Sequence, residues 1–384
     1  MKSVGIICEY NPFHNGHLYH LNKVKEMFNG YTIVLVMSGN FTQRGEASII
    51  DKWDKTEIAL NYGVDLVIEI PFVFATQSAD TFAKASITLL DAVGVDYIVF
   101  GSETNNIDKL TEMANIQLKN KNYDKIVKEY LNQGINYPSA LSKALFDITG
   151  SKVSKPNDIL GISYIREILK LNSSIKPMCI KRNNDYNSIH LEDDITSATS
   201  IRYALKHKDN VHKYVPLYSN TFLSDNLFFI ENYFPLLKFK ILTDLNNLAK
   251  YQTVDEGIEN RIAKSIINCK SLDELILKIK TKRYTYNKLN RMFTHILCNF
   301  TKEESKKFNT PEYIRVLGFN KNGQNYLKYI KNGSKLPIIT NYSTINSSML
   351  DLEFRSTCVY SSILNEKDKI KLIESEYKNS PIIK

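Results

Sequence analysis

Five short apolar runs, separated by segments with helical spacing, constrain the fold of this 384-residue chain more than any other feature. Continuous, β-branched runs of this length are typical of strands that are buried on both faces of a parallel sheet. Segments 51–63 and 78–94, which lie between runs, carry apolar residues at helical spacing. The sequence therefore predicts an α/β fold in which right-handed crossovers join parallel strands. The five runs are SVGIIC (3–8), TIVLVMS (32–38), DLVIEI (65–70), DYIVFG (96–101) and IKPMCIK (175–181).

The order of these segments predicts two domains, which is also what the chain length favours. The first spans residues 1–207 and contains a helical insertion at about 105–171. Segment 206–221 loses periodicity and reads as a link, and residues 220–384 have a mostly helical pattern. Within this second part, KLPIITNYSTI (335–345) fits either a strand or an extended connection.

Positive charge is concentrated in the second part of the chain. Residues 1–200 hold 20 Lys and Arg against 23 Asp and Glu, a net charge of −3, whereas residues 201–384 hold 30 against 18, a net charge of +12. Such asymmetry favours a polyanion, above all a nucleic acid, as the partner of the second part. The alternative is a lysine-rich solvated surface in a chain that is rich in Lys and Asn.

The cysteines and the apolar runs argue against several classes of protein. The five cysteines are odd in number and never spaced as CxxC, so neither a disulfide framework nor a zinc ribbon is indicated. The sequence shows no basic-then-apolar leader, and no apolar run approaches the roughly 20 residues that span a bilayer. We therefore expect a cytoplasmic protein with no membrane partner; no protein partner is evident.

The stretch GIICEYNPFHNGHLYHL (5–21) places three of the seven histidines where the first predicted strand hands over to a helix. Parallel sheets bind ligands beyond the carboxyl ends of their strands, and a helix N-terminus attracts phosphate. We interpret His14 and His17 as phosphate contacts, with Gly16 allowing close approach of the backbone. A zinc site is the alternative, although Glu9 is the one nearby acidic partner. His20 reads better as a partly buried structural residue.

HNGH (14–17) resembles the HxGH signature of the nucleotidyltransferase superfamily, and TSATSIR (196–202) is similar to its second, Ser/Thr-rich loop. Five stretches together resemble the bacterial tRNA(Met) cytidine acetate ligase family over about residues 4–205, with a weaker likeness in YIRVLGFNKNG (313–323). These stretches are GIICEYNPFHNGH, MSGNFTQRGE, GVDYIVFGSE, PNDILGISYI and SATSIR.

The resemblance implies a Rossmann-like parallel-sheet nucleotidyltransferase domain, which binds ATP and is catalytic, over residues 1–207. A basic, mostly helical tRNA-binding C-terminal domain over residues 220–384 would follow it. Members of the family use ATP and acetate to form N4-acetylcytidine at the wobble position of elongator tRNA(Met). Two other functions stay open from the residues alone. One is an adenylyltransferase that acts on a small phosphorylated metabolite, and the other is a non-catalytic RNA-binding protein with a nucleotide-binding fold.

The same resemblance implies the residues of the reaction. His14, His17, Ser200 and Arg202 would be catalytic, with the two histidines on the phosphate that is attacked and the other two on the β- and γ-phosphates. Mg²⁺ would accompany ATP, because neutralising the triphosphate is part of the transition state; no dedicated metal site is predicted. The ATP contacts would be Ile7, Cys8, Glu9, Tyr10, Asn11, Pro12, Phe13, His14, Asn15, Gly16, His17, Leu18, Tyr19, His20, Gly101, Asn157 and Arg182.

Two further groups of residues are read from their surroundings. The polar loop after the second predicted strand is interpreted as a substrate pocket made of Ser38, Asn40, Gln43 and Arg44, with Arg44 or Lys52 near an anion. Trp53 is assigned to the core. In KIKTKRYTYNKLNRMF (278–293), cations interleaved with aromatic residues fit the recognition of RNA phosphates and unpaired bases. The tRNA contacts predicted there are Lys278, Lys280, Lys282, Arg283, Lys288 and Arg291.

Overall fold

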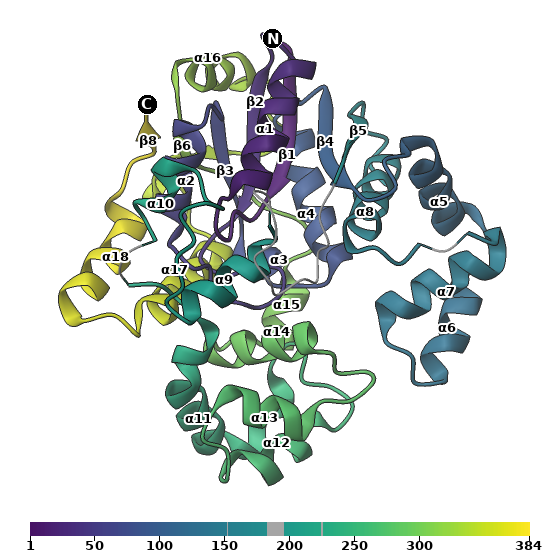
Figure 1. Cartoon of the computed structure of the whole chain (residues 1–384), viewed down its shortest axis with the longest axis vertical. Coiled ribbons are helices and arrows are strands. Elements are labelled where there is room, and N and C mark those ends of the chain that lie inside the picture. Colours follow the sequence, from purple (N-terminus) through teal and green to yellow (C-terminus); the bar gives the residue numbers. More distant parts are fainter. Residues whose placement is uncertain (152, 183–195, 224–225) are drawn as a thin grey trace.

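The fold is built on an eight-stranded sheet, seen near the centre of the computed structural model (Figure 1). The structure describes residues 1–151, 153–182, 196–223 and 226–384. All five predicted strands form, as β1 (Ser3–Cys8), β2 (Thr32–Ser38), β3 (Leu66–Ile70), β4 (Tyr97–Ser102) and β5 (Lys176–Lys181). They pair in parallel in the order β5-β4-β1-β2-β3, which confirms the expected α/β sheet.

The strand order reverses beside β1. The chain passes from β1 to β2 and β3 on one side, and then returns to place β4 and β5 on the other. Such a reversal leaves a crevice beyond the carboxyl ends of the two strands where the order changes, here β1 and β4. Helices α1 (Asn15–Met27), α2 (Lys52–Asn61), α3 (Phe72–Ala75) and α4 (Ala79–Ala92) connect these strands.

The stretch expected to be a helical insertion is helical, but its last helix belongs to the sheet layer. α5 (Ile107–Lys119), α6 (Tyr123–Asn132) and α7 (Tyr137–Thr149) extend to the side of the sheet in Figure 1. α8 (Pro156–Lys170) instead packs against α4 and β4. Its Gly161 lies against the ring of Phe100, where a β-carbon would come within 2.4 Å of the ring.

The second part of the chain is mostly helical, as expected, and it also completes the sheet. β6 (Ile314–Phe319) pairs antiparallel with β3, and β7 (Ile338–Ile339) and β8 (Ile382–Ile383) pair with β6. The sequence analysis did not predict these strands. The short β7 lies inside segment 335–345, for which a strand was one alternative. The division of the chain into two domains, with a boundary between residues 207 and 220, stays a prediction.

The remaining helices fall into three places. α9 (Ala198–Lys206) and α10 (Leu217–Asn220) follow β5 in the chain. α11 (Phe234–Thr243), α12 (Ile258–Ile266), α13 (Leu272–Ile279) and α14 (Tyr286–Leu297) form the lower lobe in Figure 1, and the last of these lies nearest the sheet. α15 (Lys302–Lys307) precedes β6 in the chain, and α16 (Lys321–Ile330), α17 (Ser348–Ser361) and α18 (Glu366–Lys378) follow it. Short 3-10 segments lie at Ile230–Tyr233, Leu245–Lys250 and Tyr342–Thr344.

The apolar side chains of both parts join in one continuous core. Phe72, after β3, packs edge-on against Phe300, and Phe41, after β2, packs edge-on against Tyr360 of α17. Trp53 is 8% exposed and lies in this core, as predicted. Among the described residues, no helix is both long enough and apolar enough to cross a bilayer.

Candidate functional site

A cavity of about 250 Å³ opens beyond the carboxyl ends of β1, β4 and β5. This is where the strand order reverses, and the residues that end these three strands lie in its wall. The lining also includes the first turns of α1 and α9 and the loop after β2. From the strand ends, the cavity is lined by Ile7, Cys8, Phe100, Gly101, Ile180 and Lys181.

His14 and His17 lie side by side in this cavity, with ring centroids 3.9 Å apart. His14 caps α1: its Nδ1 accepts a hydrogen bond from the backbone N–H of Gly16 at 3.0 Å. The Nδ1 of His17 accepts one from the backbone N–H of His14 at 3.3 Å. Because both Nδ1 atoms accept, each neutral ring carries its proton on Nε2. The helix start therefore presents the Nε2–H of His14 as a donor, whereas the ring of His17 also donates to the Pro12 carbonyl.

Burial keeps both rings uncharged. It lowers the pKa of His14 to about 3, with further lowering by the nearby Arg182 and Arg202. Burial, followed by the neighbouring His14 ring, lowers the pKa of His17 well below its usual value. A neutral donor on His14 and the nearby guanidinium groups suit an anion that gains charge during a reaction.

One side of the cavity, at the ends of β4 and β5, collects three residues from distant parts of the sequence. Gly101 lies against the Arg182 side chain, where a β-carbon would come within 3.0 Å of it. Arg182 donates from Nη1 to the side-chain oxygen of Asn157 at 3.4 Å, and Asn157 donates to Glu103 at 2.7 Å. The structure thus brings together the three residues expected to contact ATP outside the first loop.

The start of α9 forms another part of the lining. Ser197 caps this helix by accepting from the backbone N–H of Ser200 at 3.0 Å, and Ser197 and Thr199 line the cavity. Arg202 lines it too; its Nη2 lies 2.8 Å from Glu46 Oε2, and its Nη1 donates to the carbonyl of Asn11 at 2.8 Å. Arg202 therefore holds the loop after β2 against the loop after β1.

Ser200 differs from the expectation. Its side chain is fully buried, shares a hydrogen bond with Ser197 Oγ at 2.8 Å, and does not line the cavity. Ser200 lies three positions after the capping Ser197 and points back into the protein, so the cavity lining at this helix start comes from Ser197, Ala198 and Thr199 instead.

The loop after β2 supplies the opposite side of the cavity. Gln43, Arg44 and Glu46 line it, together with Glu9 at the end of β1. Glu9 Oε1 accepts the backbone N–H of Gln43 at 2.6 Å and the Ser38 hydroxyl at 3.4 Å. Burial raises the pKa of Glu9 from its usual value. This side therefore carries the cavity's acidic groups.

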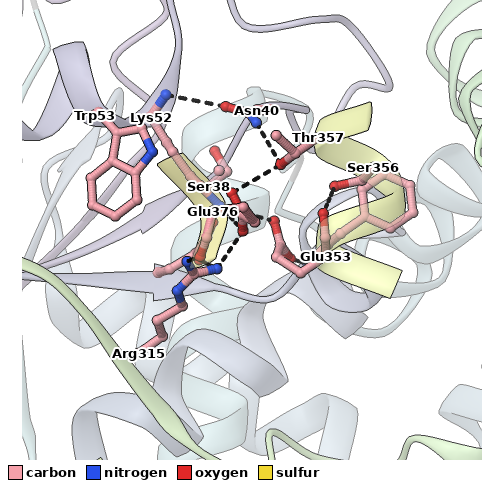
Figure 2. Close-up of polar contacts among 12 residues, drawn as sticks. Ser38, Asn40, Lys52, Trp53, Arg315, Glu353, Ser356, Thr357 and Glu376 are labelled. Carbon is pink, nitrogen blue, oxygen red and sulfur yellow. Dashed lines mark hydrogen bonds and ion pairs between the residues drawn. The ribbon is translucent and has the colours of Figure 1, made fainter. Parts of the chain in front are cut away.

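Ser38, Asn40 and Lys52 lie outside this cavity, contrary to the expectation that they form or flank a substrate pocket. All three are buried, and Figure 2 shows them beside residues of the C-terminal helices. Asn40 accepts the backbone N–H of Lys52 at 3.1 Å and donates to the Thr357 hydroxyl at 3.0 Å. Polar residues that end a strand can point to the interior when a distant segment supplies partners.

Lys52 belongs to a buried ionic cluster, which we define as Lys52, Glu69, Arg315, Glu353 and Glu376, and Thr357 donates to Glu376 of this cluster at 3.1 Å. Figure 2 labels its members except Glu69. Lys52 Nζ lies 2.7 Å from Glu69 Oε1 and 2.7 Å from Glu376 Oε1, and Arg315 Nη1 lies 3.2 Å from Glu69 Oε2. In the described part of the chain, the three carboxylates form the group whose spacing suits a metal ion. The two cations already occupy the space between them, so we infer no metal site.

Four residues of the expected ATP loop, Pro12, Phe13, Asn15 and Leu18, do not line the cavity. Phe13 stacks on Tyr62 with centroids 5.0 Å apart, and Asn15 donates to the Lys213 carbonyl at 2.9 Å. Among the lining residues that the sequence analysis missed, the apolar ones lie on α4, α8 and strand ends, where they read simply as core. The missed residues are Glu46, Phe82, Phe100, Leu160, Tyr164, Ile180, Lys181, Ser197, Ala198 and Thr199.

The predicted tRNA contacts divide into two groups. Lys278, Lys280, Lys282 and Arg283 are exposed on or just after α13. The ammonium of Lys288 lies 3.9 Å from the centre of the Tyr284 ring. Arg291 faces the β2 loop instead: it donates to the Gln43 carbonyl at 3.3 Å, and burial lowers its pKa to about 10. Its main chain meets this loop at Gly45, whose φ of +77° and close backbone contact leave no room for a β-carbon.

Comparison with known proteins agrees with this geometry. The HIGH Nucleotidyl Transferase family model matches residues 1–375. The tRNA(Met) cytidine acetate ligases of Geobacillus sp. (strain WCH70) and Oceanobacillus iheyensis are 40% and 39% identical to the chain, each over 100% of both sequences. The apo crystal structure of Thermotoga maritima TmcAL is 34% identical, covers 100% of this chain and 99% of its own, and superposes with a TM-score of 0.92.

A second crystal structure of Thermotoga maritima TmcAL, bound with alpha-thio ATP, gives a TM-score of 0.88 at 34% identity, again over 100% of this chain. The likeness therefore covers the sheet, the lower lobe and the helices around β6 together. The chain belongs to the HIGH nucleotidyl transferases and, within them, to the family of the tRNA(Met) cytidine acetate ligases.

Proposed function

We propose that this protein activates acetate with ATP and transfers the acetyl group to N4 of the wobble cytidine of elongator tRNA(Met). The neutral Nε2–H donor of His14, beside the His17 ring, carries the proposal, because it lies in a nucleotide-sized crevice of a chain that matches these ligases over its full length. ATP is the substrate that His14 and His17 would bind.

In the first step, an acetate oxygen attacks the α-phosphate of ATP. A phosphorus–oxygen bond to acetate forms, the bond to the β-phosphate breaks, and pyrophosphate leaves. The two histidines donate to oxygens of the attacked phosphate, where charge builds up. Arg182 holds the nucleotide on the β4–β5 side, whereas Arg202 and the Ser197–Thr199 turn stabilise the departing pyrophosphate.

In the second step, the N4 amine of cytidine attacks the acetyl carbonyl of the adenylate. The carbon–nitrogen bond forms, the bond between the carbonyl carbon and the phosphate oxygen breaks, and AMP leaves with the electron pair. The amine loses one proton. No cysteine nucleophile is needed, which agrees with the state of Cys8: burial raises the pKa of its thiol to about 12.

Mg²⁺ would bind with the nucleotide and neutralise part of the triphosphate charge. In this proposal its ligands are phosphate oxygens and water, the usual arrangement when a protein binds a metal-nucleotide. Among the described lining residues the carboxylates do not cluster in a set of three, which fits an ion held mainly by ATP.

The tRNA would meet the exposed cations of the lower lobe, Lys278, Lys280, Lys282 and Arg283. Their exposure and the net charge of +12 on residues 201–384 support phosphate contacts. Lys288 and Arg291 act indirectly, by positioning the nearby tyrosine and the β2 loop.

The test is mass spectrometry of nucleosides from tRNA that has been incubated with the protein, ATP and acetate. We expect N4-acetylcytidine at the wobble position of elongator tRNA(Met), and none when either ATP or acetate is left out. Consumption of ATP on small phosphorylated metabolites, with the tRNA unchanged, would favour an adenylyltransferase. Binding of tRNA without ATP turnover would favour an RNA-binding protein.

A further inference from the structure

We propose that the carboxylate of Glu9 is the general base that removes the proton from cytidine N4 in the transfer step. This inference rests on the proposed function. The family resemblance implies only that Glu9 contacts ATP, and the reaction scheme gives its carboxylate no chemical role.

The chemistry requires a proton acceptor at this stage. The lone pair of an exocyclic cytosine amine is delocalised into the ring, so the amine is a weak nucleophile. As the carbon–nitrogen bond forms, the nitrogen becomes positively charged and must lose a proton before AMP leaves cleanly. In the balanced step, the nitrogen gains the acetyl carbon, AMP takes the electron pair of the broken anhydride bond, and Glu9 takes the proton.

The histidines at the helix start cannot accept this proton directly. The Nδ1 atoms of His14 and His17 already accept backbone N–H groups, and their Nε2 atoms carry hydrogen. The Nε2 of His20 is covered by protein atoms, so a substrate cannot touch it. These rings are donors or structural groups.

The other polar side chains of the lining are excluded for different reasons. Glu46 is held 2.8 Å from Arg202 in an ion pair, which weakens it as a base. Burial holds the pKa of the Cys8 thiol at about 12 and that of Tyr164 well above its usual value, so both carry their protons at neutral pH. Among the described lining carboxylates, this leaves Glu9.

The geometry of Glu9 suits the task. Among the residues that the structure describes, the hydrogen bonds to its carboxylate, from the Gln43 backbone and the Ser38 hydroxyl, both fall on Oε1, so the side chain is fixed and Oε2 accepts none from them. Glu9 ends β1 next to the β2 loop, on the side of the cavity away from Gly101 and Arg182. If the nucleotide lies over β4 and β5, the side of the cavity that carries Glu9 remains open to the cytidine amine.

The groups that face Glu9 tune its basicity. Burial raises its pKa, Glu46 adds to this, and Arg44 of the loop and Lys55 of α2 oppose it. Cys8 and Tyr164, which also face it, stay uncharged. A carboxylate with a raised pKa is a stronger base than an exposed one.

Glu9→Gln provides a matched test, because the amide oxygen can still accept from Gln43 and Ser38. Adenylate formation is measured as acetate-dependent pyrophosphate release without tRNA. Transfer is measured in a single turnover, from adenylate formed in place to tRNA. We expect the variant to slow transfer at least about 100-fold more than it slows adenylate formation. The exposed Glu26→Gln on α1 is the control and should change neither rate.

The pH dependence of the transfer rate distinguishes a base from a purely structural residue, because loss of a structural residue would not change the shape of this dependence. In the wild type, the transfer rate should rise with pH along an acidic limb, which Glu9→Gln removes and Glu9→Asp partly restores. Equal slowing of both steps, or an unchanged transfer rate with the limb intact, would overturn the assignment. Wild-type protein that forms the adenylate but acetylates no tRNA would instead overturn the proposed function, and the assignment with it.

Discussion

At the scale of single residues, His14 combines two roles in one ring. Its Nδ1 caps α1, and its Nε2–H is left as a donor in the cavity. The sequence indicated the second role through the HNGH pattern. It did not indicate the first, because histidine is not among the usual capping residues. An alanine substitution would therefore mix a loss of chemistry with a loss of helix stability.

His14→Asn separates these two roles. Asparagine is a good N-cap and can accept from Gly16, but it provides no donor at the place of Nε2. We expect acetate-dependent pyrophosphate release to fall by about 10²- to 10³-fold, as for loss of one donor to a developing anion. The melting temperature should stay close to that of the wild type. His14→Ala should lose the same activity and, in addition, about 1 kcal/mol of stability. Full activity of the asparagine variant would show that Nε2 contacts no phosphate.

His295 is a second histidine that folding keeps neutral. It is fully buried on α14, and its Nε2 lies 2.7 Å from the Thr76 carbonyl. Burial lowers its pKa to about 4. Between about pH 4 and the ordinary value near 6.5, the unfolded chain therefore binds one more proton at this site than the folded chain does.

The consequence is that stability falls as the pH falls through this window. We expect His295 to contribute about 1.4 kcal/mol per pH unit to the slope of unfolding free energy between about pH 6 and about pH 5. Urea unfolding of the wild type and of His295→Gln at both pH values measures it. The variant, which can still donate to Thr76, should show a slope shallower by this amount. Parallel slopes would show that His295 is charged in the folded protein.

At the scale of elements, the buried ionic cluster joins α2, β3, β6, α17 and α18. Its three carboxylates face two cations, so one proton makes it neutral. Burial and the neighbouring Glu69 raise the pKa of Glu353 to about 8, which makes Glu353 the protonated member. Burial also acts on Glu376, but Arg315 and Lys52 outweigh it and hold its pKa at about 2.

Two amide substitutions in the cluster should therefore have opposite effects. Glu376→Gln leaves two buried cations facing one ionised carboxylate and should cost about 3 to 5 kcal/mol of unfolding free energy. Glu353→Gln resembles the protonated acid, so it should match the wild type near pH 4.5 and have a higher unfolding free energy than the wild type at about pH 6. The raised pKa of Glu353 makes the wild type lose stability as the pH rises from about 4.5 through about 8, whereas Glu353→Gln escapes this loss. Denaturant unfolding of both variants at about pH 6 and about pH 9 measures the difference; equal losses would contradict the assigned proton.

The elements that the sequence predicted share one property: their signal is local. The runs that became β1 to β5 are apolar and short, and HNGH sits between a strand and a helix. Asn40 and Lys52 were misassigned because their partners, Thr357 and Glu376, lie more than 300 positions away in the chain. Ser38 was misassigned because its side chain is fully buried, although its hydroxyl contacts Glu9 of the cavity lining. Ser200 was misassigned because the residue that caps α9 is Ser197. A shift of a few positions along a helix changes the direction in which a side chain points.

At the scale of the whole molecule, the cavity and the exposed cations of the lower lobe form separate surfaces. We expect replacement of Lys278, Lys280 and Lys282 by Ala to flatten the salt dependence of tRNA binding by about two units in log affinity against log salt, because each lost phosphate contact contributes about 0.7 to 0.9. Acetate-dependent pyrophosphate release without tRNA should persist. Filter binding over a salt series measures the slope.

A matched control comes from the other end of the molecule. Lys321, Lys328 and Lys331 on and just after α16 are also exposed, and α16 lies at the top of Figure 1 while α13 lies at the bottom. Their replacement by Ala removes the same total charge and should leave the slope unchanged. Equal flattening by both triple variants would mean that net charge, rather than the lower lobe, determines tRNA affinity.

The position of β6 has a consequence for synthesis of the chain on the ribosome. β3 is wholly buried in the finished protein, and its outer edge pairs with β6, where Arg315 stands opposite Glu69. At about 5 to 20 residues per second, the ribosome needs roughly 12 to 50 s to pass from Ile70 to Ile314. Throughout that interval the nascent sheet has an apolar edge with free N–H and C=O groups, the type of surface that pairs with other chains. Synthesis of this enzyme therefore requires either that a chaperone protects the β3 edge or that β3 joins the sheet only late.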